Sequence, residues 1–507
     1  MVRGRARGRA RAAALLAWLP LLLIGLIGAG LAGCATNPVT GRPQLALMSE
    51  AQEIRLGREA APEIARRYGG AYDDPALQAY VREVGQRLAA VSHRPQLVYH
   101  FTVLDSPEVN AFSLPGGYVF IARGLLAYLN DEAELAGVLG HEIGHVTARH
   151  AVRQYSAAQA ARLLYGVGSL FLPELRSQAA QDLFNVLGTA WLRGYGREME
   201  LEADRLGAEY LARAGYDPRA MLRVIELLKD QEELERRLAK EEGRPPRVYH
   251  GIFATHPSND RRLQELVRAA QRLRPPGRPR PVSREAFLPH LEGLAYGDSY
   301  RSGVRRGHRF YHGPLGFALS FPEGWRVENR PDLVLARSPE GDALLALRVE
   351  DLNRRMPPEA FMRQRLGLKR LERVQALEGL GKGASAGASA VAWMDTPFGR
   401  RPAWVAVVYL GERAYVFLGA VRRERDPRSR DALFAATARS LHALSGAERA
   451  LAQPLRIRLH RARAGETFAR LARGSPLGRH AEELLRLLNG LWPNREPTPG
   501  LLLKLVR

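Results

Sequence analysis

The sequence is poor in cysteine and in lysine, and each shortage excludes a class of protein or site. Cys34 is the single cysteine among 507 residues, so the chain can form no intramolecular disulfide, no Cys₄ or Cys₂His₂ zinc site and no thioredoxin-like redox pair. Only five of the 75 basic residues are lysine and the rest are arginine. The formal net charge of +22 fits a nucleic-acid or anionic partner, but the arginine excess beside abundant Ala, Gly and Leu favours codon bias in a GC-rich genome.

The remaining composition is that of a folded protein with several domains. Hydrophobic residues make up 46% of the chain and charged residues 25%, which excludes a disordered or collagen-like protein. A chain of 507 residues exceeds what one ordinary core supports, so we expect two to four domains.

The N-terminus has the pattern of an export signal. Residues 3–11 carry five Arg and no acid, residues 15–27 are apolar, and small residues follow up to Cys34. A basic start, a short apolar run and small residues are typical of a secretory signal. The alternative is an uncleaved transmembrane anchor, because residues 12–33 are long enough to cross a bilayer. Pro20 and the glycines that follow it disfavour such a stable helix.

The end of this signal, Leu31-Ala32-Gly33-Cys34, resembles the lipobox of bacterial lipoproteins. The resemblance implies removal of residues 1–33 and acylation of Cys34, which would attach the protein to a membrane by lipid. Ala35, where an inner-membrane retention signal would have Asp, favours the outer membrane. Removal of the signal takes away five Arg and no acid, which lowers the net charge from +22 to +17. Export also argues against a nucleic-acid partner.

Periodic patterns predict the elements that follow. Residues 37–57 are interpreted as a tether followed by a helix start at Ser49. Apolar residues at helical spacing predict a helix over 75–91, and β-branched and aromatic residues predict a strand over 98–104. Residues 109–114 and 118–121 are expected to be strands around a Pro-Gly-Gly turn. A further helix is predicted from about Asp131 to His150.

This last helix contains the motif His141-Glu142-Ile143-Gly144-His145. His141 and His145 are i and i+4, so both imidazoles leave one helix face and can bind one zinc ion. Glu142 is rotated by about 100° along the helix and can take a proton from water that the metal acidifies. The bland alternative is a buried histidine pair in a structural helix. Three glycines on the same helix (Gly137, Gly140, Gly144) suggest close backbone packing or a cramped site.

A catalytic zinc site needs a third protein ligand. Glu200 and Asp204 are i and i+4 in Gly194–Gly207, on a second expected helix. Glu200 can complete a His₂Glu set, and Asp204 can orient a ligand imidazole. Spacing alone does not choose Glu200 over Glu198 and Glu202, and the segment could be a solvated acidic helix face.

The two motifs together resemble zinc endopeptidases related to the CAAX prenyl protease, in particular their bacterial periplasmic lipoprotein branch. The resemblance covers residues 37–275 and implies a gluzincin-type zincin with one Zn²⁺ held by His141, His145 and Glu200. It implies that the strand around Asn110 and Ala111 holds substrate. It further implies that His256, in Thr255-His256-Pro257, stabilises the oxyanion or occupies the zinc position at rest, and that Arg261 orients it or contacts substrate. The other histidines, His150 among them, are expected to be surface or packing residues.

The second half of the chain has no catalytic pattern. The expected fold class of the whole chain is α+β. We expect five segments: a signal peptide (1–33), a mainly helical protease domain with a small sheet (34–275), a linker (276–309), an α+β accessory domain (310–445) and a βααβ module (449–507). Residues 381–388 are interpreted as a small-residue loop. Residues 464–502 resemble a LysM module, which implies peptidoglycan as a partner.

Two functions follow as hypotheses. The first is a lipid-anchored zinc endopeptidase on the periplasmic face of the bacterial outer membrane, which degrades misfolded or unassembled envelope proteins. The second is an assembly chaperone or peptidoglycan-binding lipoprotein whose metal site is structural or silent. The intact Glu142 favours the first.

Overall fold

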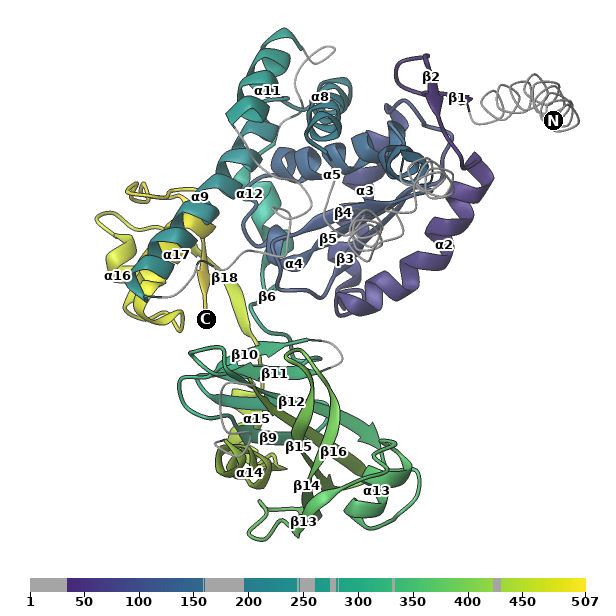
Figure 1. Cartoon of the computed structure of the whole chain (residues 1–507). Helices are drawn as coiled ribbons and strands as arrows, with labels where there is room; N and C mark the ends of the chain where they lie inside the picture. The colour runs from purple at the N-terminus through teal and green to yellow at the C-terminus, as the bar shows by residue number, and fades with distance from the viewer. Residues whose placement is uncertain are drawn as a thin grey trace, which may run out of the picture.

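The structure, a computed structural model, describes residues 34–157, 159, 196–243, 246, 260–273, 280, 282–330, 333–422 and 430–507. A helical N-terminal half is followed by a β-rich region and by a short C-terminal unit (Figure 1). The predicted mixture of helix and sheet is therefore confirmed. Within these residues no helix is long and apolar enough to span a membrane. The signal segment 1–33 lies outside the described residues.

The N-terminal segment is a hairpin rather than the predicted tether. Strand β1 (Cys34–Thr36) pairs antiparallel with β2 (Pro43–Leu45), and the Asn37 side chain accepts hydrogen bonds from the backbone of Val39 and Thr40 in the turn. Helix α2 (Glu50–Arg67) then begins at a capping box between Ser49 and Gln52. The sequence reading missed the hairpin because its strands have three residues each.

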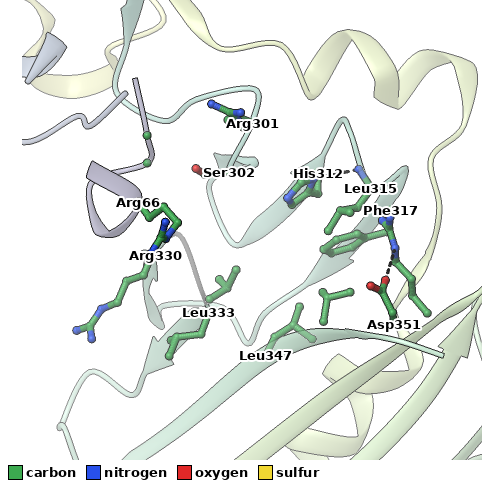
Figure 2. Close-up of a pocket in the computed structure, with 15 residues that line it drawn as sticks. Arg66, Arg301, Ser302, His312, Leu315, Phe317, Arg330, Leu333, Leu347 and Asp351 are labelled. Atoms are coloured by element: carbon green, nitrogen blue, oxygen red, sulfur yellow. Dashed lines mark hydrogen bonds and ion pairs between the residues drawn. The ribbon is translucent and has the colours of Figure 1, made fainter. Parts of the chain in front are cut away.

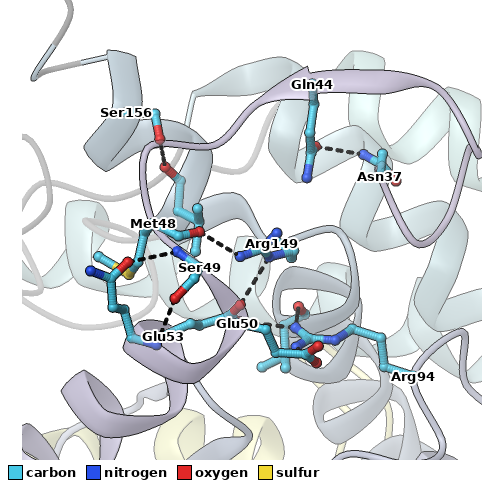
Figure 3. A network of polar contacts seen from close by, with 12 residues as sticks. Asn37, Gln44, Met48, Ser49, Glu50, Glu53, Arg94, Arg149 and Ser156 are labelled. Atoms are coloured by element: carbon cyan, nitrogen blue, oxygen red, sulfur yellow. Dashed lines mark hydrogen bonds and ion pairs between the residues drawn. The ribbon is translucent and has the colours of Figure 1, made fainter. Parts of the chain in front are cut away.

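A buried ion-pair network fixes α2 to the rest of the domain (Figure 3). Glu53 is 1% exposed and accepts hydrogen bonds of 2.9 Å from both Arg94 and Arg149. Arg94 also donates to the Val146 carbonyl oxygen, and Arg149 to that of Met48. The carboxylate of Glu53 therefore links the N-terminal segment to the end of the helix that carries the histidine motif.

The N-terminal half contains a three-stranded sheet. Its order is β3 (His100–Leu104), β5 (Tyr118–Ala122), β4 (Ala111–Leu114); β3 runs parallel to β5 and β4 antiparallel to it. The predicted hairpin around Pro115-Gly116-Gly117 is confirmed, with both glycines at positive φ. Helix α3 (Pro75–Ala90) packs on β3, and a short α4 (Arg123–Leu126) follows β5. Strand β4 lies at the edge of this sheet.

Among the described residues of this half, four longer helices follow. They are α5 (Glu132–Thr147), α8 (Arg197–Arg213), α9 (Ala220–Glu241) and α11 (Asp260–Arg272). Helix α5 begins where expected: the Asp131 side chain accepts from the Glu134 N–H as its N-cap. It is buried along almost its whole length between α3, α8 and α9. The motif helix is thus the central element of the domain.

The β-rich region contains two antiparallel sheets. The four-stranded sheet has the order β17 (His442–Ala443), β9 (Phe317–Ser320), β8 (Arg309–His312), β7 (Val304–Arg306). The seven-stranded sheet has the order β10 (Arg326–Asn329), β11 (Val334–Arg337), β12 (Ala343–Asp351), β16 (Arg413–Val421), β15 (Gly399–Leu410), β14 (Ala384–Thr396), β13 (Glu372–Ala376). Helices α13 (Pro358–Gln364) and α14 (Asp431–Arg439) pack against it. We call residues 304–443 the β domain.

Two sequence readings of this half differ from the structure. Residues 276–309 were expected to be a linker, but they contain α12 (Arg284–Phe287), a 3₁₀ turn η3 (Leu288–Leu291) and β6 (Ala295–Tyr296), whose apolar side chains are buried in the core of the helical domain. Residues 384–388, expected to be loop, begin β14. Its small side chains Ala388, Ala390 and Ala392 leave room for the Phe361 and Met362 side chains of α13.

The C-terminal unit has the order strand, helix, helix, strand. After the short helix α15 (Gly446–Leu451) come β18 (Leu455–Arg461), α16 (Phe468–Ala472), a 3₁₀ turn η4 (Gly478–His480), α17 (Ala481–Leu488) and β19 (Leu502–Val506). Strand β18 pairs with β19 and also with β6. Figure 1 shows this unit, in yellow, with its helices beside α9 and its strand β18 reaching toward the green β domain. Its resemblance to LysM remains a prediction.

The C-terminal unit shares one hydrophobic core with the helical domain. Phe468, Leu488 and Leu503 belong to the same buried cluster as Val138 and Leu139 of α5. Two cations reinforce the junction. The Lys504 ammonium, 0% exposed, donates to the carbonyl oxygens of residues 127 and 129. Arg284 donates to side-chain oxygens on both sides, at 2.7 Å from Asn130 Oδ1 and 2.6 Å from Asn489 Oδ1.

Arg284→Ala tests this junction. The substitution leaves two amide oxygens and the Leu502 carbonyl oxygen without their guanidinium donor. We expect a loss of about 2–5 kcal/mol of stability in denaturant unfolding, because buried acceptors lose a charged partner. The helical domain and the C-terminal unit should unfold together. Glu285→Ala, on the exposed side of the same helix, is the control and should change stability little.

The partly buried Glu108 gives the fold a pH dependence. Burial raises the pKa of Glu108 to about 7, although the Arg330 guanidinium opposes the rise, and its Oε2 has no hydrogen-bond partner among the described residues. Between pH 4.5 and 7 the folded chain therefore holds a proton that the unfolded chain has lost, so Glu108 lowers stability progressively as the pH rises through this window.

Glu108→Gln removes this pH-dependent cost. At pH 8 we expect the variant to be more stable by about 1–3 kcal/mol, with a higher Tm. At pH 4 the two proteins should be nearly equal, because the wild-type carboxyl is then neutral in both states. Thermal unfolding of both proteins across this range measures the effect, and an equal difference in Tm at pH 4 and pH 8 would contradict the assignment.

Candidate metal centre

Helices α5 and α8 approach closely because glycines line their contact. A Cβ atom on Gly144 would lie 2.9 Å from the Ala203 carbonyl oxygen, and one on Gly140 would lie 3.3 Å from that of Gly207. Side chains cannot normally come so close to backbone atoms, so larger residues would separate the helices. The expectation of close backbone packing at these glycines is confirmed.

This contact brings three buried side chains together. The Nε2 atoms of His141 and His145 lie 3.0 Å apart, and the Glu200 carboxylate oxygens lie 3.5 Å from the first and 3.4 Å from the second. All three residues are at most 7% exposed. They form a cluster that could hold a metal ion, with one ligand atom from each side chain within 4.8 Å of the others. Of Glu198, Glu200 and Glu202, it is Glu200 whose carboxylate lies near Nε2 of both His141 and His145.

The donor set fits zinc. Zinc bound at 2.0–2.1 Å in tetrahedral geometry has its ligand atoms about 3.3 Å apart, close to the separations in this cluster. Two imidazoles and one carboxylate are the ligands of His₂Glu catalytic sites. The electrostatics agree: burial lowers the pKa of His141, but the Asp204 and Glu200 carboxylates outweigh this and raise it to about 10. The same negative field that attracts a proton favours a divalent cation.

Asp204 sets the tautomer of the first histidine. Its Oδ1 lies 2.9 Å from Nδ1 of His141, and both side chains are buried. Because the carboxylate can only accept, Nδ1 carries the proton and the Nε2 lone pair of His141 is left for a metal. The structure therefore places Asp204 where the sequence analysis expected it.

A second chain of hydrogen bonds sets the tautomer of His145. Nδ1 of His145 lies 2.8 Å from Nδ1 of His150, whose Nε2 lies 3.1 Å from Glu202 Oε2. Hydrogen bonding from His150 and from Arg153 lowers the pKa of Glu202 to about 2, and burial lowers the pKa of His150. A neutral His150 thus donates to the ionised Glu202 and accepts from His145. This arrangement directs the Nε2 lone pair of His145 toward His141 and Glu200, where a metal would bind.

His150, expected to be a surface or packing residue, is buried and in addition contacts the ligand histidine His145, which the sequence analysis did not predict. Five residues after His145, His150 would point away from it on a continuous helix. Helix α5 ends at Thr147, however, and Arg149 takes a positive φ of 54°, so the chain turns and His150 returns to the site. Arg149 is held in this unfavourable conformation by Glu53. No periodic signal marks such a turn.

Glu142 follows His141 in the chain, and its carboxylate is oriented by strand β4. Glu142 is 0% exposed, and the Ser113 hydroxyl lies 3.0 Å from its Oε2 and 3.2 Å from its backbone oxygen. Ser113 was not singled out from the sequence. Its position in the strand expected to hold substrate, two residues after Ala111, was the one feature of the sequence that could have pointed to this role.

The residues predicted to contact substrate lie at the start of this edge strand. Ala111 is the first residue of β4, and Asn110 precedes it; both are at most 1% exposed. Neither Oδ1 nor Nδ2 of Asn110 has a hydrogen-bond partner in the part of the chain that the structure describes. A buried amide with no partner is costly, so Asn110 is suited to receive an external polar group.

Two further predicted site residues cannot be placed. His256 lies outside the described residues, as does the side chain of Arg261 at the start of α11. The predicted lipidation residue, Cys34, is the first residue of β1.

The sequence matches a known protease family over the segment that carries this geometry. Residues 75–270 match the model of peptidase family M48. The matched residues include both motif helices and the edge strand.

Individual relatives match over a similar region. The beta-barrel assembly-enhancing protease of Escherichia coli strain K12 is 32% identical over 269 residues, 50% of this chain and 51% of the relative. The mitochondrial metalloendopeptidase OMA1 of Schizosaccharomyces pombe is 30% identical, over 45% of this chain and 64% of its own. That of Arabidopsis thaliana is 34% identical, over 39% and 37%. The chain thus spans about half the length of the first curated relatives that it matches.

Solved structures were matched as well. Cyanobacterial PsbP from Synechocystis sp. PCC 6803 aligns with 28% of this chain and 95% of its own at 15% identity, with a TM-score of 0.22. A TM-score this low carries no argument about the fold.

His150→Phe tests the hydrogen-bond chain to His145. Phenylalanine fills the space of the ring but can neither accept from His145 nor donate to Glu202. We expect zinc affinity to fall about 10- to 100-fold, as for other groups that orient metal ligands. Competition with a chromophoric chelator measures it. Glu226→Gln, an exposed residue of α9, is the control, and an unchanged zinc affinity in His150→Phe would contradict the assignment.

Proposed function

We propose that the protein is a zinc-dependent endopeptidase of the bacterial cell envelope that degrades misfolded or unassembled envelope proteins. The observation that carries this proposal is the cluster of His141, His145 and Glu200, with the buried Glu142 next to His141 in the chain. Both imidazoles present Nε2 to one point, and each is oriented through Nδ1 by its own hydrogen-bond partner. A purely structural site would have no need of the buried Glu142.

The substrate peptide is proposed to bind as an added strand beside β4. This strand is at the edge of its sheet, so its outer backbone groups can pair with an extended chain of almost any sequence. The side chain of Asn110 can donate to and accept from the peptide backbone as well. Ser113, on the same strand, touches Glu142, so a peptide in this register would pass the catalytic carboxylate.

Glu142 is proposed to move the protons of the reaction. It takes one from the water that attacks the peptide carbonyl carbon and delivers it to the leaving nitrogen as the C–N bond breaks. Ser113 holds the carboxylate in position for both transfers. Zinc, when bound, supplies Lewis-acid polarisation of the carbonyl and acidifies the water. His256 and Arg261 are proposed to assist at the oxyanion and at the substrate.

Location and substrates follow from the sequence and from the name of a relative. The export signal and the lipobox-like end at Cys34 support attachment to the outer membrane by lipid. A relative named as a beta-barrel assembly-enhancing protease supports a role in the envelope and envelope proteins as substrates. Peptidoglycan is retained as a proposed partner of the C-terminal unit because its element order is βααβ. A chaperone with a silent metal site is the competing function.

Glu142→Gln separates the two functions. The amide cannot take the proton, so cleavage of casein should fall by about 10²–10⁴-fold, while zinc content and Tm remain close to wild type. Chelation should abolish the wild-type activity, and added zinc should restore it. Casein cleavage that survives in Glu142→Gln or after chelation would contradict the proposal. A wild-type protein that binds zinc but cleaves no denatured substrate would favour the chaperone. Glu226→Gln again serves as the control.

A further inference from the structure

A cavity of about 500 Å³ lies between the helical domain and the β domain, far from the metal centre in sequence (Figure 2). The helical domain contributes Arg66, at the end of α2, and the loop at Gly69 and Gly70. The β domain contributes the remaining walls, from β8, β9, β11, β12 and β16 and from the loops before β7 and β11. Its volume is in the range of about 300–1,000 Å³ that is typical of ligand sites.

The polar wall of the cavity is strongly basic. Four arginines line it, Arg66, Arg301, Arg330 and Arg413, against one acid, Asp351. Three of these arginines have an acidic partner. Arg413 lies 3.7 Å from Asp351, Arg330 lies 2.8 Å from Glu328, and Arg66 pairs with Glu63. Arg301 has no ion-pair partner among the described residues, and it reaches the opposite wall: a Cβ atom on Gly70 would lie 3.4 Å from its Nη1. The cavity therefore offers an anion the unpaired guanidinium of Arg301, and beside it that of Arg413, whose long contact is to an Asp351 side chain that is 80% exposed.

The floor of the same cavity is apolar. It is formed by Phe317 of β9, Val334 of β11, and Leu347 and Val349 of β12, with Leu333 at the edge of the floor. These side chains come from strand faces. The backbone groups beneath them are committed to the sheet, since Val334 is paired with Leu347 and β12 with β16. The floor consequently offers dispersion and burial but no backbone hydrogen bonds.

His312 adds a neutral donor to the basic wall. Its Nδ1 accepts a hydrogen bond from the Leu315 N–H, so the ring proton is on Nε2. Burial, and then the Arg413 guanidinium, lower the pKa of His312 to about 4, which keeps the ring uncharged at neutral pH. The wall thus combines charged guanidinium groups with one neutral imidazole N–H, and these donors are suited to carboxylate or phosphate oxygens.

We propose that this cavity binds a single-chain anionic lipid, with a carboxylate or phosphate head on Arg301 and Arg413 and the acyl chain on the apolar floor. An acyl chain suits the floor better than a peptide does. The amide groups of a peptide would lose water over strand faces that have no backbone partners left. An acyl chain has no polar groups to satisfy. The proposal is independent of the protease activity.

Binding of dodecanoate and dodecyl phosphate to the mature chain (residues 34–507), by calorimetry below their aggregation concentrations, tests the proposal. We expect saturable one-to-one binding that weakens with salt. Arg301→Ala and Arg413→Ala should each weaken it about three- to tenfold, as the loss of a partly screened guanidinium contact. Arg301→Lys should recover part of the loss for dodecyl phosphate. Arg348→Ala is the matched control, because Arg348 lies on β12 between Leu347 and Val349 but is exposed on its opposite face.

Several results would overturn the proposal. Equal binding of uncharged dodecanol, or an equal loss in Arg348→Ala, would show unspecific surfactant binding. A short apolar peptide with a free carboxyl terminus that binds more tightly than dodecanoate would make a peptide end the ligand. If an alanine variant unfolds, Leu333→Glu gives an independent readout, since a carboxylate at the edge of the floor should repel both anionic probes. Comparison of the two probes decides between a carboxylate and a phosphate head.

Discussion

The close contact of α5 and α8 is the constraint on which the rest of the structure depends. Glycine at positions 140 and 144 lets the two helix backbones approach, and only then does Glu200 reach the imidazoles of His141 and His145. The contact is maintained from outside the site as well. The C-terminal unit shares the core around the N-terminal half of α5, and the Glu53 network fixes the other end of the helix. The metal centre is thus built by packing that spans almost the whole helical domain.

The hydrogen bonds around the site fix the tautomer and the orientation of the two histidines that this packing brings together. Asp204 and the pair of His150 and Glu202 accept or relay the Nδ1 protons of the two histidines, so both Nε2 lone pairs converge beside the Glu200 carboxylate. The negative charge of the acids would be destabilising in a buried position without a cation. A divalent metal ion resolves that charge imbalance, which is why the cluster is suited to a metal and poorly suited to remain without one.

Local patterns in the sequence predicted the parts of the site that lie on regular helices. The spacing of His141, His145, Glu200 and Asp204 follows helical periodicity, and the strands around the Pro-Gly-Gly turn follow alternation. The sequence analysis missed the residues and elements whose position depends on a break in periodicity. His150 returns to the site only because Arg149 adopts a positive φ, and the strand over 384–388 has small residues that look like a loop until α13 is packed on them. The burial of residues 284–296 was also unpredictable, because it requires the distant β18 as partner.

Zinc K-edge X-ray absorption on the wild-type protein would test the central claim most directly. The account predicts one zinc per chain, bound by two imidazole nitrogens and carboxylate oxygen and by no sulfur, since the one cysteine is Cys34 at the N-terminal hairpin. Sulfur in the first coordination shell, a single imidazole, or a protein that takes up no zinc would contradict it.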